Sequence, residues 1–133
     1  MTAVMKAKTL SVTIERRPEE VYEYFLDMTQ FPKWATSFSQ SVRKTDEGWI
    51  VETPDGPMSF RFAENRAFGV LDHYVSLVPG QEIYNPVRVV ANGSGSELMF
   101  TLYQQPGMSD DRFAEDAGMV ERDLHSLKKM LET

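Results

Sequence analysis

The stretch SDDRFAEDAGMVERDLHSLKKML, residues 109–131, decides the fold. Ser109 is a good N-cap, and the acids at 110 and 111 suit the positive end of a helix dipole. Apolar residues then recur at steps of four and three, which places them on one face of a helix: Phe113, Ala117, Val120, Leu124, Leu127 and Leu131. The stretch therefore predicts a C-terminal helix of roughly 33 Å, at 1.5 Å per residue, with one apolar stripe.

The residues before this helix alternate between turn signals and β-rich runs. Glycine, proline, aspartate and asparagine mark turns at residues 46–48, 54–57, 64–66, 79–80 and 92–95. The β-rich runs cover residues 9–14, 41–44, 49–53, 58–63, 69–78, 82–91 and 96–104. Short connections between the successive runs after residue 40 imply an antiparallel meander.

Two helical segments separate the first strand from the meander. Pro18, followed by two glutamates, opens the first segment, and the second covers residues 31–38. This order predicts an α+β, helix-grip fold: a curved antiparallel sheet of about seven strands wrapped around the long C-terminal helix, with two short helices after the first strand. We expect residues 1–133 to form one domain, because this is a common domain length.

Composition excludes several classes of function. The chain has no cysteine, hence no disulfide framework, thiolate nucleophile or thiolate metal site. A net charge of −6 repels phosphate backbones, so we expect no nucleic-acid partner. No apolar run approaches the ~18 residues that span a bilayer, so we expect no stable membrane insertion. Residues 1–14 contain no long apolar run, so we expect no secretory signal and a cytoplasmic protein.

Alternation assigns an inward face to the long strands. In residues 69–78 we expect Leu71, His73, Val75 and Leu77 to face the helix, with Asp72 and Ser76 facing water. In residues 82–91 we expect these side chains to face inward: Ile83, Asn85, Val87, Val89 and Ala91. The other inward aromatic residues are Phe60, Phe62 and Phe100.

Four motifs extend this interpretation: RPEEVY at 17–22, FPKW at 31–34, GVLDH at 69–73 and FTLYQQPGMS at 100–109. With the order of elements, they make the chain resemble the START-like superfamily, also called SRPBCC, which includes the birch-pollen allergens. The last two motifs resemble its bacterial polyketide cyclase/dehydrase-like group. The resemblance covers nearly the whole chain. It implies a cavity between sheet and long helix that holds lipids, sterols, polyketides, quinones or plant hormones; a minority of members are enzymes.

Two polar residues are candidates for chemistry in such a cavity. His73 is the only histidine that alternation places inside, where it would act as a general acid/base or donate to a ligand carbonyl. The alternatives are a hydrogen-bonded core histidine, or an outward one after a one-residue register error. Asn85 would orient a ligand through its amide. Its alternative role is to satisfy a backbone group near a bulge, beside Pro86.

Apolar residues supply the remaining candidate ligand contacts. Trp34 and Phe38 lie in the segment that, by resemblance, borders the cavity mouth, where they would form a gate or an aromatic wall. Simple packing under the sheet is their alternative role. The spacing leaves open whether the others line a void or fill it: Phe60, Phe62, Val75, Phe100, Val120 and Leu124.

We therefore predict binding or transport of a small hydrophobic molecule: a lipid, a polyketide, or another aromatic or isoprenoid metabolite. The alternative is an enzyme of polyketide cyclase, aromatase or dehydratase type, with His73 as acid/base and Asn85 or Tyr84 positioning a carbonyl. The sequence contains only a small number of candidate catalytic groups, and this favours the non-catalytic interpretation. His73 and His125 have no metal-binding spacing, so we expect no metal and no cofactor. Both a monomer and a homodimer remain open.

Overall fold

The computed structural model describes residues 4–133, so residues 1–3 of the predicted domain lie outside the described part. The helices are α1 (Pro18–Leu26), α2 (Phe31–Trp34), the short 3-10 helix η1 (Arg66–Phe68) and α3 (Asp110–Glu132). The strands are β1 (Ala7–Ile14), β2 (Ser41–Thr45), β3 (Gly48–Thr53), β4 (Gly56–Asn65), β5 (Val70–Val78), β6 (Gln81–Asn85), β7 (Val87–Asn92) and β8 (Gly95–Tyr103). This order of elements confirms the predicted α+β fold.

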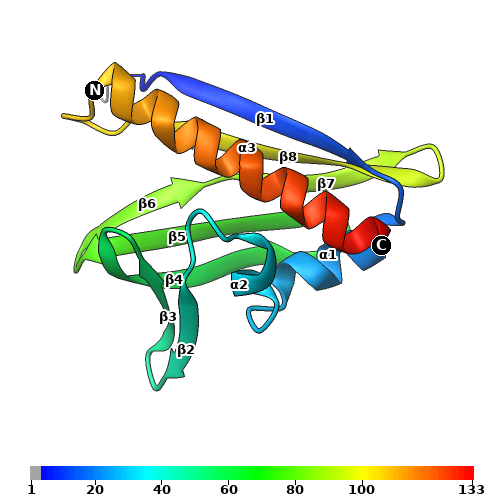
Figure 1. The fold of residues 1–133 in the computed structure, drawn as a ribbon, viewed down its shortest axis with the longest axis horizontal. Helices are drawn as coiled ribbons and strands as arrows, with labels where there is room; N and C mark the ends of the chain where they lie inside the picture. Colours follow the sequence, from blue (N-terminus) through cyan, green and yellow to red (C-terminus); the bar gives the residue numbers. More distant parts are fainter. Residues whose placement is uncertain (1–3) are drawn as a thin grey trace.

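The eight strands form one antiparallel sheet in the order β1-β8-β7-β5-β4-β3-β2, and β6 pairs with β5. The helix α3 lies across one face of this sheet beside β1, with α1 near its C-terminal end (Figure 1). Ser109 caps α3, because its hydroxyl accepts a hydrogen bond of 3.1 Å from the Arg112 N–H. The apolar stripe faces the sheet: Phe113, Ala117, Leu124 and Leu127 are buried, and Val120 and Leu131 are partly buried.

A kink at Pro86 divides the run that the sequence predicts as one strand, residues 82–91, into β6 and β7. Proline has no N–H to donate and cannot continue the ladder. Strand β5 pairs with β6 as far as His73 and Asn85, and then pairs with β7 through Val70 and Arg88. The sheet therefore has eight strands, where the sequence predicts about seven.

The kink also explains why the prediction that Asp72 faces water is wrong. Its carboxylate is buried, and accepts hydrogen bonds from the Val87 N–H at 2.8 Å and the Tyr84 hydroxyl at 2.6 Å. The Arg88 guanidinium pairs with the same carboxylate. Asp72 thus satisfies the backbone N–H that loses its strand partner beside Pro86.

Two further residues, Ser76 and Ala91, depart from simple alternation. Ser76, expected to face water, is buried, and its hydroxyl donates to the Val78 carbonyl at 2.5 Å. Ala91, expected to be inward, is exposed near the end of β7, beside the β7–β8 turn. Leu77 faces inward as expected, because it lines the space between the sheet and α3 together with Val75, and it is 47% exposed where the pairing of β5 with β6 shifts register.

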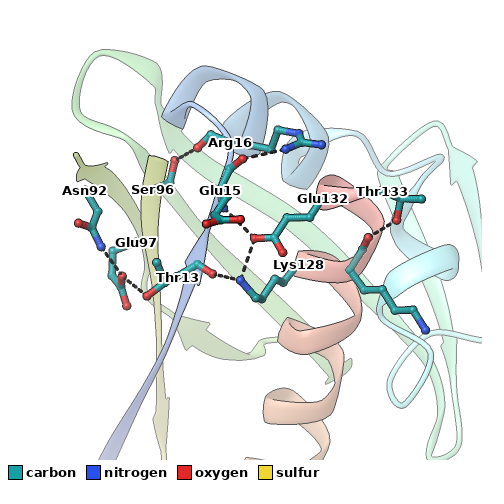
Figure 2. Close-up of polar contacts among 10 residues, drawn as sticks. Thr13, Glu15, Arg16, Asn92, Ser96, Glu97, Lys128, Glu132 and Thr133 are labelled. Atoms are coloured by element: carbon teal, nitrogen blue, oxygen red, sulfur yellow. Dashed lines mark hydrogen bonds and ion pairs between the residues drawn. The ribbon is translucent and has the colours of Figure 1, made fainter. Parts of the chain in front are cut away.

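Polar contacts fasten the C-terminal end of α3 to the end of β1 (Figure 2). The Lys128 ammonium donates to the Thr13 carbonyl at 2.6 Å and to the Glu132 carboxylate at 2.7 Å. That carboxylate also accepts from the Glu15 N–H at 2.8 Å. The last turn of the helix is therefore fixed against the first strand. Within residues 4–133, no helix has the length and apolarity needed to cross a membrane.

Candidate functional site

A cavity of about 350 Å³ lies between the sheet and α3. This volume lies near the lower end of the range for known small-molecule sites, which is roughly 300–1,000 Å³. All but one of the residues predicted to contact a ligand line it: Trp34, Phe38, Phe60, His73, Val75, Asn85, Phe100, Val120 and Leu124. The exception is Phe62, whose ring packs edge-on against Phe60 and His73, with centroids 5.1 and 5.9 Å away, without lining the cavity. That these residues bind a ligand stays a prediction.

His73 lies in the cavity wall inside a set of aromatic rings. Its imidazole stacks on Phe60, with centroids 4.7 Å apart and planes at 14°, and meets the edge of Phe100 at 5.6 Å. Only 4% of His73 is exposed. This burial lowers the pKa of His73 to about 4, because an apolar surrounding disfavours the charged imidazolium. The ring is therefore neutral at pH 7.

The tautomer of His73 follows from its backbone contact. Nδ1 lies 3.2 Å from the Leu71 carbonyl oxygen. A carbonyl oxygen only accepts, so Nδ1 carries the proton and the other ring nitrogen, Nε2, carries a lone pair. Nε2 makes no hydrogen bond to any of residues 4–133. The imidazole therefore offers an unused acceptor.

Asn85 is the register partner of His73 on β6, so the two side chains are neighbours on one face of the sheet. It is 8% exposed and lines the cavity. Its amide makes no hydrogen bond within the described part of the chain. The backbone role that was its alternative belongs instead to Asp72, on the other face of β5.

Trp34 supplies another part of the wall. Its ring packs against Phe25 and Phe31, with centroids 5.0 and 5.1 Å apart. The indole Nε1 is buried and has no hydrogen-bond partner among residues 4–133. The side chain thus combines an apolar wall with an unused donor.

Sequence reasoning missed Asp123, a buried carboxylate in the cavity lining. Its Oδ1 accepts a hydrogen bond of 2.9 Å from the backbone N–H of Ser37, in the loop after α2. Burial raises the pKa of Asp123, and the Ser37 N–H partly opposes that rise by stabilising the charged form. A signal was available: Asp116 and Asp123 are seven residues apart and so share one side of the apolar stripe.

Sequence reasoning also missed an ion pair at the edge of the cavity. Arg112 on α3 donates to Asp55, in the β3–β4 turn, at 2.7 Å and to Asp116 at 3.0 Å. Burial raises the pKa of Asp116, and the nearby Arg112 guanidinium opposes this. All three side chains line the cavity, with Glu115 beside them. This edge carries more negative than positive charge.

The arrangement suits binding more directly than catalysis. The cavity has mostly apolar and aromatic walls, which also contain an uncharged acceptor at His73 and the amide of Asn85, and its charged side chains lie on α3 and in the β3–β4 turn. Within residues 4–133, no three side chains of the metal-binding types lie close enough together to hold a metal ion.

No protein-family model matches the chain. No curated protein matches it either.

Solved structures are similar over nearly the whole chain. XoxI from Bacillus cereus has a TM-score of 0.75 at 18% identity, with 96% of each chain covered. Ara h 8.0201 has a TM-score of 0.72 at 13% identity, covering 96% of this chain and 98% of that one. The di-domain ARO/CYC BexL, from the BE-7585A biosynthetic pathway, has a TM-score of 0.75 at 12% identity; 94% of this chain matches 46% of BexL.

Identities this low establish the fold and leave the activity open. The order of elements, the sheet topology and the position of α3 agree with the similarity. The chain has the helix-grip fold that its sequence predicted, with a curved antiparallel sheet around the long C-terminal helix.

Proposed function

We propose that the chain binds a small, mostly apolar molecule in the cavity between the sheet and α3. The observation that carries this proposal is a cavity of about 350 Å³ whose walls are mostly aromatic and aliphatic. Each Å² of apolar ligand surface removed from water contributes about 25 cal/mol before the costs of association. Lipids, polyketides and other aromatic or isoprenoid metabolites belong to the proposed ligand class. A cytoplasmic location, and a monomer or homodimer, also stay predictions.

An enzyme of polyketide cyclase, aromatase or dehydratase type is the second candidate. The reason to consider an enzyme is that BexL, which is similar in structure, is described as an ARO/CYC protein. Two features of His73 favour the binding function. Its pKa of about 4 makes it a weak base at pH 7. Its Nδ1 contacts a backbone carbonyl, whereas the corresponding nitrogen of many catalytic histidines contacts a carboxylate.

Thermal-shift and calorimetric titrations with flavonoids, sterols, quinones and fatty acids test the binding function. Val120→Trp narrows the cavity from α3, and Val90→Trp adds the same side chain at an exposed position of β7. We expect a ligand to stabilise the unmodified protein and Val90→Trp, and to lose affinity for Val120→Trp. Absence of any bound apolar compound, or equal binding to both variants, would contradict the proposal.

Turnover distinguishes the second candidate. A polyketide-like substrate converted by the unmodified protein, and left unconverted by a folded His73→Gln variant, would favour the enzyme. Binding of the same compound without conversion would favour the non-catalytic function.

A further inference from the structure

The cavity presents two polar groups whose hydrogen-bonding capacity is unused. His73 offers only an acceptor, because its single proton lies on Nδ1 and contacts the Leu71 carbonyl oxygen. Asn85, its partner in the β5–β6 register, offers amide N–H donors. Both residues are more than nine-tenths buried and both line the cavity. An acceptor and a donor therefore lie side by side, next to the aromatic rings of Phe60 and Phe100.

A hydroxyl group matches this pair with one oxygen atom. Its O–H donates to His73 Nε2, while its oxygen accepts from the Asn85 amide. A ketone or ether oxygen accepts from Asn85 but leaves Nε2 without a donor. Because a buried polar group without a partner is costly, a ligand that lacks a donor is disfavoured at this position.

The charges around the cavity act against anionic ligands. Four carboxylates line it: Asp55, Glu115, Asp116 and Asp123. Among the described residues, the one lining side chain with a permanent positive charge is Arg112, which already pairs with Asp55 and Asp116. A carboxylate ligand would therefore meet repulsion at the edge and a lone pair at His73.

We propose, building on the binding function above, that the ligand is an uncharged apolar alcohol or phenol whose hydroxyl lies between His73 Nε2 and the Asn85 amide. The His73 lone pair disfavours molecules that only accept hydrogen bonds, and the lining carboxylates disfavour ligands that carry a carboxylate. The site thus distinguishes hydroxyl compounds from ethers, quinones and fatty acids of similar size.

Three probes of matched shape test this selection: 4-propylphenol, 4-propylanisole and 4-propylbenzoate, titrated calorimetrically at pH 7.5. The phenol is uncharged at this pH, and the benzoate is ionised. We expect the phenol to bind about tenfold more tightly than the ether, as one hydrogen bond allows, and the benzoate to bind most weakly. The ether is the more apolar of the first two, so hydrophobicity alone predicts the reverse order.

Variants locate the effect. His73→Phe keeps an aromatic ring and removes the acceptor, so the phenol and the ether should bind it with similar affinity. Asn85→Leu removes the donor and should reduce the preference for the phenol. Val90→Ala, at an exposed position, should keep the full preference. The three ligands on the unmodified protein decide the proposal even if the first two variants do not fold.

The outcomes separate this inference from the binding function. Equal affinity for phenol and ether, or tightest binding of the benzoate, overturns the hydroxyl selection and leaves apolar binding in place. Failure of all three probes to bind overturns the hydroxyl selection, whereas the binding function is overturned only if the flavonoids, sterols, quinones and fatty acids also fail to bind. A phenol preference that persists in folded His73→Phe also overturns the assignment.

Discussion

The Asp123 carboxylate on α3 accepts a hydrogen bond of 2.9 Å from the backbone N–H of Ser37. Ser37 belongs to the loop after α2, between Trp34 and Phe38, which both line the cavity. One carboxylate therefore fixes the aromatic edge of the cavity to the long helix. Because Asp123 is buried, the contact is shielded from water.

Replacing Asp123 tests this link. Asp123→Ala leaves the Ser37 N–H without its partner, so we expect the free energy of unfolding to fall by about 1–3 kcal/mol. Asp123→Asn keeps an acceptor oxygen of the same shape and should retain most of the stability. Urea denaturation measures the energies, and amide exchange at Ser37 should accelerate in the alanine variant alone. Unchanged exchange in Asp123→Ala would contradict the link.

His73 makes stability depend on pH. Its pKa is about 4 in the folded chain and about 6.5 when exposed, so between these values the unfolded chain takes up a proton that the folded chain does not. Lowering the pH therefore favours unfolding: the contribution is complete above pH 6.5 and is lost as the pH falls toward 4. From pH 7.5 to 4.5 we expect a loss of about 2–3 kcal/mol, measured by urea denaturation.

His73→Phe provides the control for this pH dependence. Asp116 and Asp123 have raised pKa values, so their contribution to stability grows as the pH falls and opposes that of His73. Both carboxylates are present in both proteins, and the difference between the two pH profiles isolates the imidazole. Parallel profiles would show that His73 titrates as an exposed histidine does.

The ion pair between Arg112 and Asp55 should govern how fast a ligand enters and leaves. It joins α3 to the β3–β4 turn at the cavity edge, and both side chains are about half exposed. An exposed pair contributes only about 0–1 kcal/mol to folding. Arg112→Gln should therefore leave stability nearly unchanged while it speeds ligand association and dissociation, as stopped-flow fluorescence would record.

The matched control for Arg112 is Arg17→Gln, which breaks an exposed pair with Glu20 away from the cavity. Its ligand kinetics should equal those of the unmodified protein. Added salt should shift the unmodified protein toward the Arg112→Gln kinetics, because salt weakens exposed ion pairs. If neither added salt nor Arg112→Gln changes the rates of ligand association and dissociation, the ion pair between Arg112 and Asp55 has no gating role.

Two tyrosines should respond oppositely to loss of their hydroxyl groups. The Tyr22 hydroxyl is buried and has no hydrogen-bond partner within residues 4–133, whereas the Tyr84 hydroxyl donates to Asp72. Tyr22→Phe should keep or raise the free energy of unfolding, by up to about 1 kcal/mol, and Tyr84→Phe should lower it by about 1 kcal/mol. Thermal or urea denaturation of the two variants measures these changes. A destabilised Tyr22→Phe would show that the Tyr22 hydroxyl does make a stabilising hydrogen bond.

Local patterns were sufficient to predict most of the fold. The steps of four and three in residues 109–131 predicted α3, and strand alternation placed His73 on the inner face. Alternation failed where the backbone departs from a regular ladder. Pro86 breaks one strand into two, and Asp72 is buried because its carboxylate accepts from the Val87 N–H beside that break.

The polar part of the site was harder to predict because its contacts join distant parts of the chain. Ser37 and Asp123 are 86 residues apart, and Asp55 and Arg112 are 57 apart. Spacing along one helix cannot reveal a partner from another loop. The tautomer of His73 likewise depends on how closely its ring approaches a backbone carbonyl, which no pattern of residue types specifies.

The two halves of α3 have different tasks. Every α3 side chain that lines the cavity lies between Arg112 and Leu124, whereas Lys128 and Glu132 tie the other half to β1 (Figure 2). Mutations in the first half can alter which compound is preferred while the second half maintains the fold. Such a division lets substitutions of the less buried lining residues, such as Met119 and Val120, change the preferred compound while the contacts between Lys128, Glu132 and β1 stay in place.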